Sequence, residues 1–204
     1  DLFTRVAALA YSTPAKPSCA LTRADTHIQI DGNDVVLDNQ WMWHADHDDC
    51  GGASDRCFSA HGLVVNGDNV LAYGVKAEHT FEELVVWAGE HGRVYFFQSE
   101  LPYHDPTFVG VGYLVKPDVK EHSAVGIGVY IVGNLVQATG MVFPPTVHAS
   151  NLFTWVIGRN HSQFHSVVCT EGAETGEERV CYKGDVCDFS SCYQLALPPP
   201  AAVI

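Results

Sequence analysis

The chain has 204 residues, of which 47% are hydrophobic and 17% charged, so it can bury a full core and has the size of one domain. Its 24 acidic and 11 basic residues give a formal charge of -13, which repels phosphate backbones and anionic headgroups and predicts neither nucleic acid nor a membrane as partner. No apolar run approaches the roughly 20 residues that cross a bilayer. The chain starts without Met and without a basic and then apolar leader, so we expect any signal peptide to have been removed or to lie outside this sequence.

Short β-rich runs that follow Gly, Asn and Asp corners dominate the chain, whereas helical periodicity is hard to find. Three such segments resemble one another, at residues 32–37, 67–72 and 91–96. The second and third start about 24 residues apart, the length of one solenoid coil that turns through three short strands. A loop over residues 44–61, inserted at a corner, explains the longer first interval. Two weaker coils follow, at residues 109–132 and 152–168, so we expect an all-β fold, a parallel β-helix of about five coils.

The inward faces of these coils are predicted to stack, each rung covering the next. The predicted inward residues are Ile28, Ile30, Val35, Leu37, Val70, Ala72, Val94 and Phe96. A β-sandwich is the alternative, since it also uses short strands and Gly-rich turns. Sandwiches usually show turns roughly every 8 to 12 residues, whereas the corners here repeat within a larger unit, which favours the β-helix.

Seven cysteines indicate an oxidising compartment and therefore a secreted, extracellular protein. Cys50 and Cys57 bracket a Gly-rich loop, which a disulfide between them would close. Zinc is the competing interpretation, because His44, His47 and His61 flank this pair. Structural zinc sites usually place paired cysteines about two to four residues apart, so the longer interval here favours a disulfide.

Four further cysteines crowd into a polar C-terminal stretch that has little apolar material to fold around. We predict two disulfides among them, which are Cys169, Cys181, Cys187 and Cys192. Cys19 remains as an unpaired thiol, or as a link to another chain or to a part of this chain outside the sequence. Residues 1–168 are thus predicted to form the β-helix domain, and residues 169–204 a stapled segment with a Pro-rich tail. Asn160 begins an N-glycosylation acceptor, Asn-His-Ser, which agrees with secretion as a glycoprotein.

Acidic and imidazole side chains cluster at the expected corners, and equivalent corners of a solenoid stack about 5 Å apart. Glu78 could therefore approach Glu100 or Asp46 from a neighbouring coil. Two carboxyls roughly 5 to 10 Å apart suit glycoside hydrolysis, one as general acid and the other as nucleophile or base. We select Glu78, Glu90 and Glu100 as candidate catalytic residues. The alternative is that polar corner residues only satisfy turn backbone groups and one another.

Aromatic side chains indicate carbohydrate contact, since outward rings on neighbouring coils would form a strip for sugar rings. The candidate contacts are Trp43, Trp87, Tyr103 and His79. Packing in the core or in a cap is the alternative for most of the rings. We predict no cofactor, although Asp46, Asp48 and Asp49 leave Ca²⁺ open; their spacing lacks the Gly and the terminal Glu of a calcium loop.

Four stretches carry a resemblance to a known family. They are residues 37–47 (LDNQWMWHADH), 62–70 (GLVVNGDNV), 75–79 (VKAEH) and 89–103 (GEHGRVYFFQSELPY). In this order they resemble a family of secreted microbial proteins often named after an attached coagulation-factor discoidin-type domain, and the match runs from about residue 2 to residue 168. The resemblance implies a pectate-lyase-like right-handed β-helix, more distantly similar to double β-helix enzymes that cleave β-1,3-glucans. It does not supply a function, because the family's carbohydrate role rests mainly on fold analogy.

The chain departs from that family in two ways. His44 stands where typical members have Arg, and Asp48, Asp49 and Cys50 replace a Gly-rich segment. Family chains are also several times longer, so this chain corresponds to their later part. A groove that needs the earlier coils would be absent from it.

Two functions therefore remain open. The first is an extracellular structural or carbohydrate-contacting module of a matrix, wall or fibre, which could self-assemble because a truncated β-helix exposes unpaired strands at its ends. The second is a carbohydrate-active enzyme, a glycoside hydrolase or lyase, that uses paired carboxylates. The missing coils and the lack of a compact catalytic motif favour the first. The predicted partners are a polysaccharide or further copies of the chain.

Overall fold

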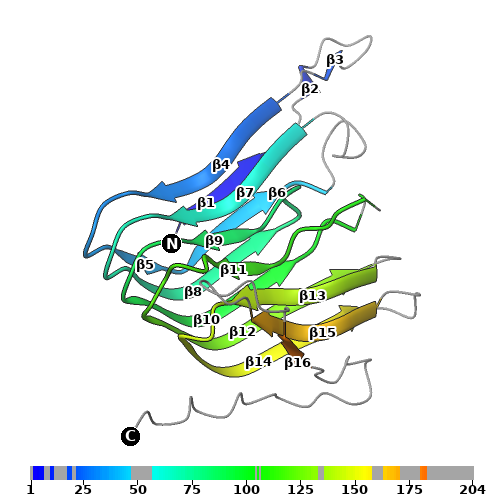
Figure 1. Cartoon of the computed structure of the whole chain (residues 1–204). Helices are drawn as coiled ribbons and strands as arrows, with labels where there is room; N and C mark the ends of the chain where they lie inside the picture. The colour runs from blue at the N-terminus through cyan, green and yellow to red at the C-terminus, as the bar shows by residue number, and fades with distance from the viewer. Residues whose placement is uncertain are drawn as a thin grey trace, which may run out of the picture.

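The chain is wound into coils of parallel strands in the computed structural model (Figure 1). The structure describes residues 2–6, 10–11, 18–19, 22–46, 57–103, 105, 107–132, 136–157, 163–170 and 180–182. Sheet 1 contains β1 (Leu2–Val6), β5 (Val36–Asp38), β6 (Gln40–His44), β8 (Leu71–Glu78), β10 (Gly92–Glu100), β12 (His122–Val132) and β14 (Val147–Ile157). Sheet 2 contains β4 (Thr22–Ile30), β7 (Cys57–Val65), β9 (Val85–Trp87), β11 (Tyr113–Val115), β13 (Val136–Phe143), β15 (Gln163–Thr170) and β16 (Val180–Tyr182).

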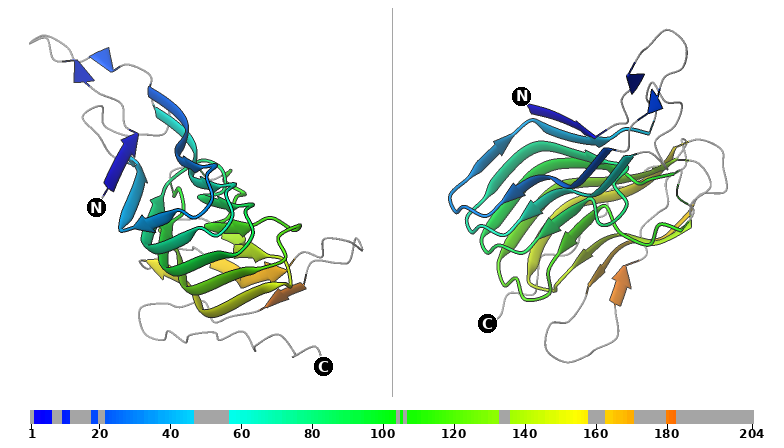
Figure 2. Two further views of the ribbon diagram at one scale, coloured as in Figure 1. Left: turned by 90° about the vertical axis from the view of Figure 1, so that its left-hand side faces the viewer. Right: turned by 90° about the horizontal axis from the view of Figure 1, so that it is seen from above.

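From β6 to β15, successive strands alternate between the two sheets, and each pairs in parallel with the strand one coil away. Figure 2 shows the resulting stack of coils from two further directions. The exceptions to parallel pairing are β16, which is antiparallel to β15, and a small ladder of β2 (Ala10–Tyr11) with β3 (Ser18–Cys19). This topology is that of a parallel β-helix and excludes the β-sandwich, whose sheets are antiparallel. The described residues contain no helix that is long and apolar enough to span a membrane.

Sheet 1 bends at the same position in five successive coils. The residues at the bend have positive φ and are Asn39 (51°), Gly74 (60°), Phe96 (62°), Gly126 (72°) and Asn151 (55°). Asn39 separates β5 from β6, whereas the other four lie inside continuous strands. One left-handed residue shifts the in-out alternation of side chains by one position. Each coil therefore has three straight segments, two of which belong to sheet 1.

This shift corrects one predicted core residue. Val94 and Phe97 point inward and are buried, whereas Phe96 is 62% exposed. The prediction of Phe96 as an inward residue assumed uninterrupted alternation along β10 and is wrong. Leu37, Val70 and Ala72 are buried as expected, and three further predicted residues are partly buried against the same core: Ile28, Ile30 and Val35.

Two corner glycines, Gly67 and Gly89, allow consecutive coils to approach closely where sheet 2 leads into sheet 1. A Cβ built on Gly67 would lie 2.0 Å from the carbonyl oxygen of Gly32, and one built on Gly89 would lie 1.9 Å from that of Gly67. The Gly67 N–H donates to the Ile30 carbonyl at 3.0 Å. These contacts leave no space for a side chain and hold the coils in register.

Candidate functional site

Two carboxylates lie side by side at the ends of adjacent strands of sheet 1. Glu78 ends β8 and Glu100 ends β10, and the two residues are register partners. Adjacent strands lie about 4.8 Å apart, so the expected approach of Glu78 to Glu100 is present. The same row across the sheet contains aromatic residues on both sides of the pair: Trp43, Tyr130 and Trp155.

Glu78 is the more buried of the two, with 7% of its surface exposed. Burial raises the pKa of Glu78, and the negative charge of Glu100 raises it further. Hydrogen bonds from Trp41 and Gln98 and the charge of His79 act in the opposite direction on that pKa. Gln98 Nε2 donates to Glu78 Oε1 at 3.2 Å. Burial and the charge of Glu100 therefore both favour the protonated form of Glu78.

We expect Glu78→Gln to remove a pH-dependent loss of stability. The folded pKa of Glu78 is raised, so its contribution to stability is complete below the unfolded pKa of about 4.3 and is lost as pH rises through the folded pKa. The Tm of the Glu78→Gln chain should match that of the wild type near pH 4 and exceed it at about pH 8. Calorimetry of both chains from acid to neutral pH measures this difference. A constant difference in Tm across the range would contradict the assignment.

A network of polar side chains holds Glu100 from the other side. His79 Nε2 lies 3.3 Å from Glu100 Oε2, and His79 Nδ1 lies 3.8 Å from Asp46 Oδ1. Tyr103 donates its hydroxyl hydrogen to Asp46 Oδ2 and packs edge-on against the His79 ring. Burial and the negative charges of Asp46 and Glu100 raise the pKa of Tyr103 to about 12, so this phenol remains a donor at neutral pH.

His79 has a positive φ of 64°, in the left-handed region where His, Asn and Asp are enriched among the residues other than Gly. It directly follows Glu78, and its backbone N–H donates to the Glu100 carbonyl oxygen at 2.8 Å. The turn therefore aims the imidazole between two carboxylates, with 4% of the side chain exposed.

Two predicted site residues lie away from this cluster. Glu90 occupies a corner before β10, where its carboxylate accepts hydrogen bonds of 3.0 to 3.1 Å from the backbone N–H groups of Lys120 and Glu121. This is the structural role that the alternative interpretation gave to corner residues. Trp87 is fully buried in the core, so its prediction as a sugar contact is wrong.

The structure adds residues that the sequence interpretation did not select. They are Gln98 and Trp41, which contact Glu78. Asp46, a predicted neighbour of Glu78, lies beside His79 and Tyr103. Trp41 and Gln98 both have Lys76 as register partner. Their row lies two residues before the row of Glu78 and Glu100, so its side chains point to the same side of the sheet. That position follows from the bend in sheet 1, which the sequence pattern does not reveal.

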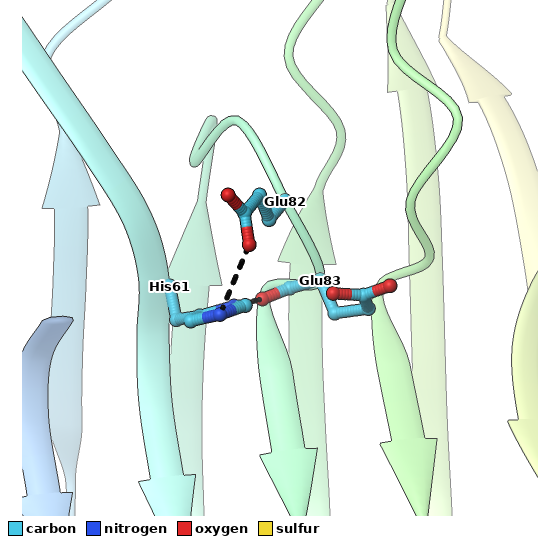
Figure 3. Close-up of side chains that lie close together, drawn as sticks. All are labelled: His61, Glu82 and Glu83. Atoms are coloured by element: carbon cyan, nitrogen blue, oxygen red, sulfur yellow. Dashed lines mark hydrogen bonds and ion pairs between the residues drawn. The ribbon is translucent and has the colours of Figure 1, made fainter. Parts of the chain in front are cut away.

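A second cluster with metal-ligand chemistry lies on the β7 side of the molecule (Figure 3). His61 Nδ1 is 2.7 Å from the Glu83 carbonyl oxygen, and His61 Nε2 is 3.3 Å from Glu82 Oε2. One ligand atom from each of the three side chains lies within 4.8 Å of the others. Glu82 is exposed, and exposed acidic groups of this kind are common without a bound ion.

The structure describes only some of the cysteines for which disulfides were predicted. Cys57 is buried, and its Sγ lies 3.1 Å from His44 Nε2. Cys169 in β15 and Cys181 in β16 are register partners of an antiparallel pair. The other positions lie outside the described residues: Cys50, Cys187, Cys192, His47, Asp48, Asp49 and Asn160. The Cys50–Cys57 disulfide, the two C-terminal disulfides and glycosylation at Asn160 therefore stay predictions. The zinc and Ca²⁺ alternatives likewise stay open.

Comparison with known proteins relates this chain to pectate-lyase-like domains and to glucanases. Residues 1–100 match the LAM55 pectate lyase-like domain. The chain is thus related to pectate-lyase-like proteins, as the resemblance implied; the accompanying discoidin-type domain stays a prediction. An exo-beta-1,3-glucanase of Streptomyces sp. (strain SirexAA-E / ActE) is 34% identical over 123 residues, which are 55% of this chain and 20% of that protein. A glucan 1,3-beta-glucosidase of Cochliobolus carbonum is 30% identical over 95 residues, 45% of this chain and 12% of that protein.

Two solved structures resemble this chain in fold. The structure of sacteLam55A from Streptomyces sp. SirexAA-E superposes with a TM-score of 0.70 and 27% identity, over 88% of this chain and 34% of that one. A variant of sacteLam55A in complex with glucose superposes with a TM-score of 0.69 and 26% identity over the same shares. The chain thus spans about a fifth or less of the curated relatives and a third of the solved ones.

Proposed function

We propose that the protein is a secreted glycoside hydrolase that cleaves β-1,3-glucans, with Glu78 and Glu100 as its acid and base. The observation that carries the proposal is the register pairing of the two carboxylates, one of them with a raised pKa. Relatives named as glucanases favour the enzyme over the structural module. The cysteine content supports secretion.

The chemistry requires a proton on one carboxyl and a free charge on the other. The protonated carboxyl donates its proton to the glycosidic oxygen as the bond to the anomeric carbon breaks. The ionised carboxylate either accepts a proton from the attacking water or attacks the anomeric carbon itself. In both cases one water is consumed, and a sugar with a free anomeric hydroxyl is released.

The neighbouring side chains orient the pair. Gln98 and Trp41 donate to Glu78, while His79 contacts Glu100 and is itself held beside Asp46 and Tyr103. Such supporting contacts keep carboxyl groups within the narrow geometry that proton transfer needs. The aromatic residues of the same row, Trp43 among them, provide flat surfaces for a sugar ring.

Incubation of the 204-residue chain with laminarin tests the proposal. We expect release of glucose or short oligosaccharides, detected by anion-exchange chromatography. The Glu78→Gln/Glu100→Gln double variant is the control for contaminating activity. If circular dichroism shows a folded chain and no sugar is released from laminarin, the proposal is wrong for this chain.

A further inference from the structure

The outer face of sheet 1 exposes aromatic and aliphatic side chains in a single area. Among the residues that the structure describes, six large hydrophobic side chains are exposed, and only Val109 lies outside this sheet. The other five come from four neighbouring strands: Val36, Trp41, Tyr73, Tyr95 and Phe96. Tyr73 and Tyr95 are register partners, and their rings stack with centroids 5.5 Å apart and planes 17° apart. Contiguous exposure of this kind marks a binding surface more often than an isolated apolar residue does.

Phe96 is costly to the fold in two respects. Its ring is 62% exposed, and its backbone has the left-handed φ of 62° that Gly and Asn adopt easily. The equivalent positions in the other coils hold Asn39, Gly74, Gly126 and Asn151. The bulky Phe96 is therefore the outlier among the five residues at this bend. An observed outlier of this type points to a function for the ring.

The exposed tyrosine rings and the carboxylate pair lie on the same sheet, on opposite sides of its bend at Gly74 and Phe96. Tyr73 precedes Glu78 by five positions and Tyr95 precedes Glu100 by five, which corresponds to about 16 Å along the strands. Trp41 lies between the two rows, beside Lys76 and Gln98. Aromatic surface therefore continues from the site at the strand ends toward the strand starts.

An open pocket of about 340 Å³ lies at the far end of this face. Arg93, Ser123 and His148 are register partners that line it, and Arg93 Nη2 donates to Asn69 Oδ1 at 2.9 Å. His122, which also lines the pocket, is 1% exposed and its Nδ1 has no hydrogen-bond partner. Hydroxyl, imidazole and guanidinium groups in a concave site are those that hydrogen-bond sugar hydroxyls.

We propose that this face binds one glucan chain lengthwise, from the carboxylate pair across Trp41, Phe96, Tyr95 and Tyr73 to the pocket at Arg93 and His148. The inference rests on the proposed function, because the glucan chain is assumed to reach the carboxylate pair that cleaves it. It makes a polysaccharide the preferred substrate, because a short oligosaccharide cannot span the face. A neutral glucan also suits the charge of -13, which would repel a second copy of the protein.

Binding to a chain that cannot cleave tests this inference separately from catalysis. The full chain carrying Glu100→Gln is titrated with laminarin in a calorimeter, with and without Phe96→Asn or Tyr95→Ser. We expect each added substitution to weaken binding by about threefold to tenfold, because stacking contacts of one ring contribute that much. Val109→Asn removes an exposed apolar side chain from elsewhere and should leave binding unchanged.

Thermal unfolding supplies a second readout that guards against misfolding. Asn occupies the equivalent bend in two coils, so Phe96→Asn should raise Tm by about 2 to 4 °C while it weakens binding. Unchanged laminarin affinity in both variants would overturn the inference, as would a concentration-dependent dimer in sedimentation that Phe96→Asn dissociates. Weaker binding without hydrolysis by the wild type would contradict the proposed function alone, and hydrolysis with unchanged affinity would contradict this inference alone.

Discussion

Glu78→Gln and Glu100→Gln are each expected to lower kcat on laminarin by about 10²- to 10⁴-fold. Gln keeps the size and hydrogen-bonding reach of the side chain but can neither give nor take the proton. Both carboxylates lie in one row of sheet 1, so each substitution removes one half of the acid and base pair. Initial rates of reducing-sugar release at saturating laminarin measure the effect.

A substrate with an activated leaving group separates the two roles. An aryl β-glucoside whose phenol leaves without protonation no longer needs the general acid, so it should restore activity to only one of the two variants. Glu90→Gln is the matched control, because its carboxylate binds the backbone at Lys120 and Glu121. It should cost about 1 kcal/mol of stability and retain kcat. If Glu90→Gln lost activity while Glu78→Gln and Glu100→Gln both remained active, Glu78 and Glu100 would not be the acid and base.

The fold and the carboxylate pair could both be predicted from the sequence for the same physical reason. Corners rich in Gly, Asn and Asp repeat with the length of a coil, and a repeat of that length places equivalent residues side by side. Glu78 and Glu100 are separated by nearly one coil, which made their approach predictable before the register was known. Asn33 and Asp34 at the first corner likewise contact the next coil at Asp68 and Asn69.

The side-chain directions could not be predicted equally well. Phe96 and Phe97 are adjacent and chemically identical, and only the left-handed bend decides that Phe97 faces the core. Trp87 was interpreted as a possible surface ring because strands usually alternate, yet β9 is short and buried throughout. Gln98 joins the site through a register that no local pattern encodes.

Gly89→Ala is expected to unfold the chain or to cost at least about 4 kcal/mol of stability. The added methyl carbon would lie 1.9 Å from the Gly67 carbonyl oxygen and 3.2 Å from that of Asn66. Both are backbone atoms held by the pairing of β7 with the next coil, so neither can move without separating the coils. Typical domains have only about 5 to 15 kcal/mol of stability to lose.

Gly32→Ala provides the matched control in the same stack of corners. A Cβ on Gly32 meets only Val35 Cγ2, at 3.9 Å, which is ordinary van der Waals contact, because no described coil approaches it from the outer side. Neither glycine has a positive φ, so the comparison isolates the close approach of the coils from backbone strain. Urea denaturation followed by circular dichroism should leave Gly32→Ala within about 0.5 kcal/mol of the wild type. Equal stabilities for Gly89→Ala and Gly32→Ala would mean that the coils are not held this closely at the corner, and the register that pairs Glu78 with Glu100 would lose its support.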